Sequence, residues 1–233
     1  MNFAIIAAGE GSRLVQEGVA TPKPLVDLDG RPMIRRLIDI FISCGASHIS
    51  IIVNEEMTEV RQYIESLTLP VPLSVVVKST PSSMHSFHEV SRSLPEGKFI
   101  LTTVDTIFRE DDFRRYTAAF QQASGVDAFM AVTDYIDDEK PLYVDVDENM
   151  SVTAFKDSTD GSERYISGGI YGLDSKAVSV LRQCIADGTA RMRNYQRALI
   201  AAGLNVKAYP FGKIIDVDHA SDIATARDFI SSI

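Results

Sequence analysis

Two short segments near the N-terminus contain residue types that bind polyphosphate. The first, AAGEGSRL at residues 7–14, directly follows a short apolar run. Its two glycines let backbone N–H groups approach an anion at little conformational cost, and Arg13 can pair with a phosphate through two N–H groups. Leu14 stands where a GxGxxG loop would have glycine, and the segment is no GxxxxGK[ST] loop. Rossmann dehydrogenases and P-loop NTPases are therefore disfavoured, although a GxG segment alone also fits an ordinary tight turn.

The second segment reads TPKPLV at residues 21–26 and continues as LDGRPMI at 28–34. Prolines on both sides of Lys23 fix the backbone and limit where its ammonium group can reach. Lys23 follows Arg13 by ten residues, so both cations could neutralise one polyphosphate. Either cation alone is typical of a solvated surface residue, and on that basis the loss of either should leave the thermal midpoint nearly unchanged.

Together the two segments resemble the signature of the sugar-phosphate nucleotidyltransferases, a group that includes the MobA-like NTP transferases. That signature is AAGxG[ST]RL followed by [TS]xKPL[VL]x[LV]xG[RK]P[ML][IL], and this chain matches it nearly throughout. The resemblance implies transfer of a nucleoside monophosphate from a nucleoside triphosphate to a sugar 1-phosphate or similar phosphomonoester, with release of pyrophosphate and Mg²⁺ as cofactor. It implies catalytic roles for Arg13 and Lys23. The nucleotide-binding residues that we predict are Ala8, Gly9, Glu10, Gly11, Ser12, Arg13, Lys23, Ser82 and Ser83.

The resemblance also implies carboxylates that hold the metal ion. The family places an Asp after its fourth strand, which matches Asp105 in LTTVDTIF. A later segment, IIDVDHASDI, places Asp216 at the family's second metal carboxylate, and Asp218 follows two residues on, where a strand would point it the same way. Carboxylate oxygens suit Mg²⁺. The alternative is that Asp218 and Asp222 merely cap the last helix.

The same resemblance implies an acceptor site in the second half of the chain. SGGIY at 167–171 is similar to the family's N[AS]G[IV][YF] strand, where glycine lets a sugar approach the backbone, so we predict acceptor contacts at Gly168 and Gly169. Lys156 matches the position of a family lysine that binds the acceptor phosphate, although the usual EKP sequence is absent. The alternative is an exposed lysine after a strand. The hydroxyl-rich segment KSTPSSMHS at 78–86 replaces the family's Gly-Thr at the base site, and it does not identify the base.

These residues need a scaffold, and the chain alternates strand-like with helix-like segments. Apolar runs predict buried strands at 3–8, 49–53, 73–77 and 99–104, and apolar residues at helical spacing predict helices at 32–46, 58–67, 83–94 and 111–122. Ser82 or Ser83 is a plausible cap for the third of these helices. Strands that are apolar on both faces indicate a mainly parallel sheet covered by helices. The resemblance implies the matching α/β fold, a mixed, mainly parallel twisted sheet with helices on both faces, Rossmann-like and of the nucleotide-diphospho-sugar transferase type.

The second half is richer in strands. We predict strands at 128–133, 166–173 and 206–210, a hairpin of 143–146 with 152–155, and helices at 176–186, 191–202 and 220–231. The expected organisation is a single domain over 1–233, with a nucleotide-binding half at 1–125 and a β-rich acceptor-binding half at 126–233.

Charge and composition exclude several other functions. The 233 residues contain 23 Lys and Arg against 32 Asp and Glu, a net charge of −9, which disfavours nucleic-acid binding. Cys44 and Cys184 lack metal-site spacing and are expected to be buried and reduced. The sequence has no run long enough for a membrane helix and no leader pattern, so we expect a cytoplasmic protein without a membrane partner. The oligomeric state stays open.

Two alternative functions are compatible with parts of the pattern. A molybdopterin guanylyltransferase-like enzyme shares the first motif, but the KPLV context and the strand around Gly168 and Gly169 disfavour it. A catalytically silent, nucleotide-binding regulatory module is disfavoured because the chain retains all four charged residues that the chemistry requires. Turnover with Mg²⁺ and mixed triphosphates would separate an enzyme from such a module.

Overall fold

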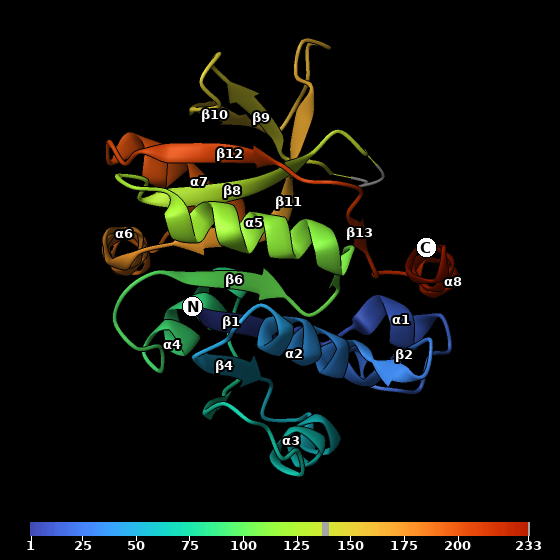
Figure 1. Cartoon of the computed structure of the whole chain (residues 1–233). Coiled ribbons are helices and arrows are strands. Elements are labelled where there is room, and N and C mark those ends of the chain that lie inside the picture. Colours follow the sequence, from blue (N-terminus) through green and yellow to red (C-terminus); the bar gives the residue numbers. More distant parts are fainter. Residues whose placement is uncertain (137–139, 233) are drawn as a thin grey trace.

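One mixed sheet organises the molecule (Figure 1). Within residues 1–136 and 140–232, which the computed structural model describes, nine strands join in this sheet, with the central order β10-β9-β11-β6-β1-β4-β5 and with β8 between β11 and β12. The parallel half consists of β1 (Asn2–Ala7), β4 (His48–Val53), β5 (Leu73–Val77) and β6 (Phe99–Thr103). The other half consists of β8 (Ala128–Thr133), β9 (Tyr143–Val146), β10 (Val152–Lys156), β11 (Tyr165–Leu173) and β12 (Val206–Pro210).

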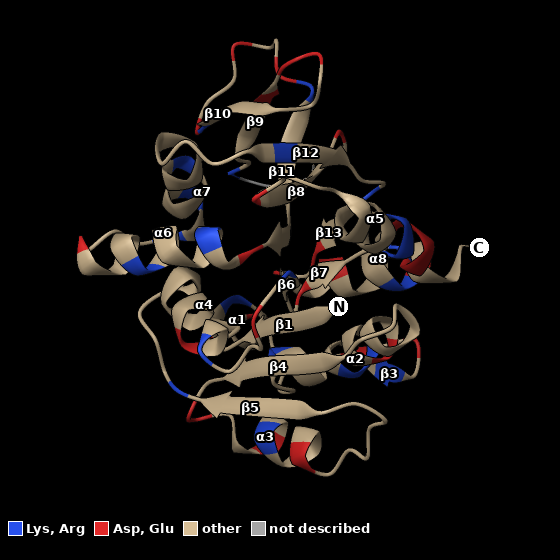
Figure 2. Cartoon of the chain, turned by 60° about the vertical axis from the view of Figure 1, so that its left-hand side comes forward, with Lys and Arg blue, Asp and Glu red and all other residues tan. Residues whose placement is uncertain are grey.

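Alternation along β1 shows how helices come to cover both faces of the sheet. Phe3 and Ile5 pack into a core with α2 (Met33–Ser43), α3 (Thr58–Glu65), α5 (Glu110–Gln122) and α8 (Ala220–Ser231). Ala4 and Ile6 pack into a second core with α4 (Ser83–Ser91), α6 (Ser175–Ala186) and α7 (Met192–Ala201). Figure 2 shows α4 and α6 on one side of the strands and α2, α5 and α8 on the other. The predicted fold class is confirmed.

Strand β11 joins the two halves. It runs antiparallel to β6 of the parallel half and antiparallel to β8 of the second half. The predicted hairpin forms as the antiparallel pair β9–β10, and β9 also pairs with β11. A register shift in the β11–β8 pairing between Ser167 and Tyr171 falls at the glycine pair.

Several short elements near the predicted motifs did not follow from sequence periodicity. They are α1 (Ser12–Gln16), a 3-10 turn η1 (Lys23–Leu25), and the two-residue strands β2 (Asp27–Leu28), β3 (Arg31–Pro32), β7 (Thr106–Ile107) and β13 (Ile215–Asp216). The pair β7–β13 joins the segment after β6 to the segment before α8.

The last helix returns to the N-terminal half. Helix α8 lies beside α1 and β2 (Figure 1), and the Arg227 guanidinium donates to the Asp27 carbonyl over 2.9 Å. Among the described residues, none of the helices combines the length and apolar character needed to cross a membrane. Cys184 is buried as expected, whereas Cys44 at the end of α2 is only half-buried, so the prediction of a buried thiol was wrong there.

Candidate active site

The glycine loop after β1 packs directly against Lys23. Gly11 has the left-handed φ of 63° and precedes α1, and a Cβ at this position would lie 3.0 Å from Lys23 Cβ. Any side chain at residue 11 would therefore be strained and crowded. Lys23 itself opens η1 between Pro22 and Pro24, and its side chain is only 9% exposed. The two motifs that were predicted to act together thus touch at Gly11 and Lys23.

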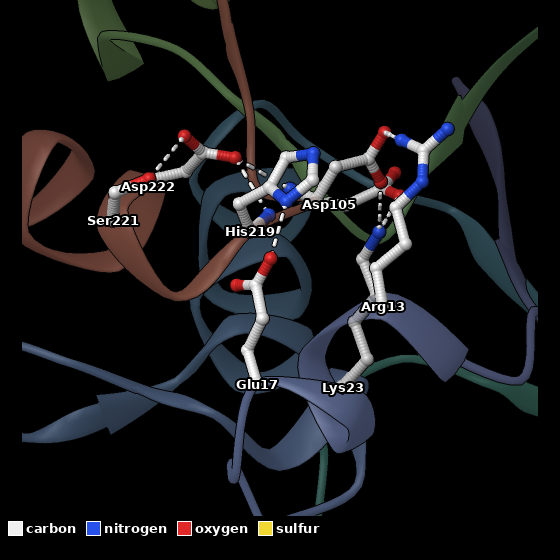
Figure 3. Close-up of polar contacts among 8 residues, drawn as sticks. Arg13, Glu17, Lys23, Asp105, His219, Ser221 and Asp222 are labelled. Atoms are coloured by element: carbon white, nitrogen blue, oxygen red, sulfur yellow. Dashed lines mark hydrogen bonds and ion pairs between the residues drawn. The ribbon is translucent and has the colours of Figure 1, made fainter.

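Lys23 lies between two carboxylates (Figure 3). Its Nζ is 2.5 Å from Asp105 Oδ2 and 2.7 Å from Asp218 Oδ1, and Arg13 Nη1 is 3.0 Å from Asp218 Oδ2. We call Arg13, Lys23, Asp105 and Asp218 the ion array. Two cations and two carboxylates balance its formal charge. The prediction that Lys23 behaves as a surface cation was wrong, because Gly11 and both carboxylates enclose it.

The array holds its charges firmly. Burial alone lowers the pKa of Lys23, but Asp105 and Asp218 outweigh burial, and the net pKa is raised. Burial likewise raises the pKa of the Asp218 carboxyl, but its hydrogen bond and charge interaction with Lys23, together with Arg13, hold the net value below the usual range. Lys23 and Asp218 are therefore both ionised at neutral pH.

Strand pairing brings together carboxylates that lie more than a hundred positions apart in the sequence. Asp105 follows β6, and its carbonyl accepts from Val217 N over 3.1 Å, while Asp216 pairs with Thr106 across β13–β7. Strand β13 ends at Asp216, and Asp218 lies beyond it with its carboxylate on Lys23. Asp216 is exposed. Within the described ranges no three or more His, Cys, Asp or Glu side chains form a ready metal cluster, so the trio of Asp105, Asp216 and Asp218 stays a prediction.

The alternative role of the late aspartates as caps holds for one of them. Asp222 Oδ2 accepts from the backbone N–H groups of Asp218, over 3.0 Å, and of His219, over 2.7 Å, at the start of α8. The Asp218 carboxylate contacts the two cations instead. Asp222 is thus a capping residue, while Asp218 belongs to the ion array.

A cavity of about 380 Å³ opens beside the glycine loop. It brings together the loop, the base-site segment and half of the ion array. Its lining includes Ala8, Gly9, Glu10, Gly11, Ser12, Lys23, Asn54, Thr80, Ser82, Ser83, Ser86 and Asp105. All the predicted nucleotide-binding residues except Arg13 therefore border one space. Ser82 is the N-cap residue of α4, one of the two positions predicted, but its hydroxyl lies 2.9 Å from His85 Nδ1 and makes no capping bond to the helix.

A second cavity of about 260 Å³ lies on the other side of the ion array. Arg13 and Asp218 of the array line it, together with Asp216. Its further lining includes Tyr135, Lys140, Ser167, Gly168, Arg193, Ile214 and His219. The motifs gave no signal for Tyr135, Lys140 or Arg193, which belong to a loop and to α7. The ion array thus borders both cavities, with Lys23 and Asp105 on one side and Arg13 and Asp218 on the other.

Close packing leaves no room for a side chain at Gly168 and Gly169, the two glycines predicted to contact the acceptor. A Cβ at Gly168 would lie 2.4 Å from Ile214 Cδ1 and 3.2 Å from the Ala131 carbonyl oxygen. Gly169 has a φ of 72°, and a Cβ there would be 3.1 Å from Thr106 Oγ1. Close packing therefore explains both glycines without a ligand, while Gly168 also lines the second cavity.

Lys156 is engaged by a carboxylate of its own hairpin and by one from the segment between β10 and β11. Its Nζ lies 2.7 Å from Asp145 Oδ2 and 2.8 Å from Glu163 Oε1, and these carboxylates raise its pKa. The cations that line the second cavity are Arg13, Lys140 and Arg193. A role of Lys156 in holding the acceptor phosphate stays a prediction.

Comparison with known proteins supplies the family. Residues 3–196 match the MobA-like NTP transferase domain. This chain belongs to that family. Among curated proteins, the chain is similar to the 2-aminoethylphosphonate cytidylyltransferase of Lancefieldella rimae, with 26% identity over 113 residues, a match that covers 47% of this chain and 45% of that protein. It is also 26% identical over 154 residues to the CMP-5'-(3-aminopropyl)phosphonate synthase of Streptomyces rubellomurinus, covering 58% of this chain and 24% of that protein.

Solved structures share the fold of this MobA-like chain over nearly its whole length. The inositol-1-phosphate CTP transferase from T. maritima superimposes with a TM-score of 0.81 at 19% identity, covering 99% of this chain and 97% of that one. A putative glucose-1-phosphate thymidylyltransferase from Bacillus anthracis gives a TM-score of 0.85 at 20% identity, covering 100% and 96%. The matched segments span less than half the length of the curated relatives.

Proposed function

We propose that this MobA-like protein is a nucleotidyltransferase, which transfers a nucleoside monophosphate from a nucleoside triphosphate to a phosphate-bearing acceptor and releases pyrophosphate. The observation that carries the proposal is the ion array, which borders a glycine-loop cavity on one side and a second cavity on the other. In this assignment the half at 1–125 binds the nucleotide, and the half at 126–233 binds the acceptor. The family match and the names of the curated relatives support it.

The reaction forms one P–O bond and breaks another. An acceptor phosphate oxygen attacks the α-phosphorus of the triphosphate, and the bond to the β-phosphate oxygen breaks to release pyrophosphate. A phosphomonoester is already largely ionised at pH 7, so the acceptor needs no dedicated general base. The protein must therefore orient two anions and neutralise their charge. Gly9 and Gly11 supply backbone N–H groups near the phosphates, while Lys23 and Arg13 supply positive charge.

The residues of the array fit a divalent cation. Two hard carboxylates already converge on a positive charge, since the Lys23 ammonium lies within 2.7 Å of both Asp105 and Asp218. These carboxylates, with the neighbouring Asp216, would hold Mg²⁺, which prefers oxygen ligands and completes its shell with substrate oxygens and water. When bound, such an ion neutralises charge on the phosphate oxygens. Lys23 would then leave the carboxylates and turn toward the triphosphate.

The relatives guide the choice of substrates to test. One relative is named as a cytidylyltransferase of an aminoalkylphosphonate and another as the synthase of a CMP-linked aminoalkylphosphonate, so we propose CTP as the first donor and aminoalkylphosphonates beside sugar 1-phosphates as acceptors. Gly168 and Lys156 stay proposed contacts of the acceptor, and Ser82 and Ser83 stay proposed contacts of the nucleotide.

A substrate screen tests the proposal. The four nucleoside triphosphates would each be mixed with 2-aminoethylphosphonate, phosphocholine and a panel of sugar 1-phosphates, with Mg²⁺ present, and pyrophosphate would be measured. Pyrophosphate that depends on both an acceptor and the wild-type array is the expected result. Acceptor-independent release of orthophosphate, or release that is equal in a Lys23→Met variant, would contradict it.

A further inference from the structure

A glutamate outside the family motifs ties the glycine-loop helix to the last helix of the chain. Glu17, directly after α1, has Oε1 at 2.6 Å from His219 Nδ1 (Figure 3). Its Oε2 accepts from the Ala220 backbone N–H over 2.6 Å. These contacts join residues more than 200 positions apart in the sequence. We call Glu17, His219 and Ala220 the clamp.

The clamp adds a distant partner to a helix start that already has a local one. The Asp222 carboxylate accepts from the backbone N–H groups of Asp218 and His219, and the Glu17 carboxylate accepts from the next one, that of Ala220. Three consecutive donors at the start of α8 are therefore satisfied by two carboxylates. The Asp222 contacts lie within the α8 segment itself, so they cannot fix its position relative to α1, whereas the Glu17 contacts can.

Arg13 lies in α1 and Glu17 is the residue that caps its C-terminal end. They are four residues apart, a spacing that places two side chains on the same side of a helical turn. Arg13 reaches the Asp218 carboxylate, and Glu17 reaches the next two residues. Bonding to the Ala220 amide and then to His219 lowers the pKa of Glu17, so Glu17 is anionic at neutral pH.

Arg13 and Glu17 differ in what happens when a polyphosphate binds. On the proposed function, Arg13 and Lys23 turn from Asp218 toward the phosphates, which releases the ion pairs that join α1 and η1 to the segment before α8. The Glu17 contacts involve no residue of the ion array, so they persist. We propose that Glu17 is a positioning residue, which keeps Asp218 in register with the glycine loop while Arg13 and Lys23 bind polyphosphate. This inference rests on the proposed function.

The experiment compares Glu17→Ala and Glu17→Gln with Glu65→Ala as the matched control. Glu65 is also an exposed glutamate bonded to a side-chain partner, Arg61 at 2.8 Å, but it lies on α3. Binding of inorganic pyrophosphate with Mg²⁺ would be measured by calorimetry, and amide hydrogen exchange would be followed over residues 217–222. If the screen has found a substrate pair, kcat and KM for the triphosphate would be measured as well.

Glu17→Ala should weaken pyrophosphate binding by roughly ten-fold, by analogy with the loss that follows removal of a residue that orients a metal ligand. It should speed exchange at Ala220 and raise the triphosphate KM, with the unfolding midpoint close to that of Glu65→Ala. Glu17→Gln keeps an acceptor for the Ala220 N–H and should recover most of the pyrophosphate affinity. If the negative charge of Glu17 were what mattered, Glu17→Gln would bind pyrophosphate as weakly as Glu17→Ala.

Two results would overturn the inference. One is wild-type pyrophosphate affinity and exchange in Glu17→Ala, and the other is a Glu17→Gln variant as weak as Glu17→Ala. A wild-type protein that neither binds pyrophosphate nor turns over would refute the proposed function instead, while faster exchange at Ala220 in Glu17→Ala would still show that the clamp docks α8.

Discussion

Lys23 pairs with two carboxylates, those of Asp105 and Asp218, and on the proposed function a bound polyphosphate would compete with them for its ammonium group. Its ammonium is fixed by Asp105 and Asp218, and its stem packs on Gly11. The motif predicted that Lys23, Asp105 and the glycine loop belong to one site. It did not predict that Asp218 also binds Lys23. These two residues are 195 positions apart, and local sequence patterns do not specify such a distant contact.

Removing Lys23 should affect both activity and stability. Lys23→Met should lower turnover by about 10²–10³-fold, the size of one lost electrostatic donor. It also leaves two facing carboxylates without their cation. Unfolding stability should fall by about 1–2 kcal/mol, less than the 3–5 kcal/mol of a fully buried pair, because solvent reaches Asp218. Chemical denaturation measures this change, and Asp218→Asn in the Lys23→Met background should restore part of the loss. Full stability in Lys23→Met would contradict the structure.

Arg13 provides the contrasting case. Its side chain is 52% exposed and pairs only with the half-exposed Asp218 in the ion array. Arg13→Ala should therefore lose turnover to a similar degree as Lys23→Met, while its thermal midpoint stays near that of the wild type. Scanning calorimetry beside the turnover assay separates the two variants. A large drop in the Arg13→Ala midpoint would mean that the contact is structural.

Elements of the main sheet and its helices followed from periodicity, whereas the elements at the site did not. The strand Leu73–Val77 and the helix Ala220–Ser231 were predicted with their observed bounds, because each has enough residues to carry a pattern. The pair β7–β13 has two residues in each strand. Such short elements form because distant segments meet, so local patterns contain no information about them.

Close packing at the β11 bend makes Gly168 sensitive to the smallest side chain. Gly168→Ala should destabilise the fold by about 1–3 kcal/mol, the usual cost of overpacking, since the new Cβ would lie 2.4 Å from Ile214 Cδ1. Ile214→Val removes that methyl group and should recover part of the loss in the double variant. Denaturation curves of the single and double variants measure the effect. Equal stability of Gly168→Ala and wild type would show that no packing constraint acts there.

Glu163, which pairs with Lys156, should titrate below the usual range of a glutamate. The hydrogen bond from Lys156, followed by that from Thr159, lowers the pKa of Glu163 to about 2. A carboxyl with a lowered folded pKa stabilises the fold above its unfolded pKa of roughly 4.3 and loses that contribution as the pH falls toward 2. Lys156→Met should raise the Glu163 pKa toward its ordinary value, as measured by carboxyl NMR.

An unchanged Glu163 titration in Lys156→Met would contradict this arrangement. The separate prediction that Lys156 orients the acceptor phosphate requires a further effect, a rise in acceptor KM that exceeds any rise in triphosphate KM. A normal acceptor KM together with a raised Glu163 pKa would assign Lys156 to the hairpin alone.

At the scale of the whole molecule, one sheet carries two cavities that meet at the ion array. The sequence predicted the two halves and the sheet, and the metal-carboxylate motif marked the returning segment 214–219, but the second cavity also uses Arg193 from α7, which no motif marked. The ion array places the Asp105 and Asp218 carboxylates close together, so a cation must lie between them both with and without bound polyphosphate. Lys23 fills that need when polyphosphate is absent, and a divalent ion would fill it once Lys23 turns to the phosphates.

Metal removal should therefore stop catalysis without unfolding the protein. EDTA should abolish pyrophosphate release, and added Mg²⁺ should restore it, while circular dichroism and the thermal midpoint stay unchanged because Lys23 neutralises Asp105 and Asp218. Asp105→Asn should lose the metal-dependent turnover. Full activity in EDTA would show that catalysis does not require a divalent ion.

The most direct test follows the phosphorus atoms themselves. Nucleoside triphosphates labelled at the α-phosphate or at the γ-phosphate would be incubated with the acceptor panel and the wild-type protein. We predict that α-label appears in a nucleotidyl derivative of the acceptor, joined through a new P–O–P bond, that γ-label appears in pyrophosphate, and that both products are lost in Lys23→Met. Transfer of γ-label to the acceptor, or its release as orthophosphate with no nucleotidyl derivative of the acceptor formed, would contradict nucleotidyl transfer at this site.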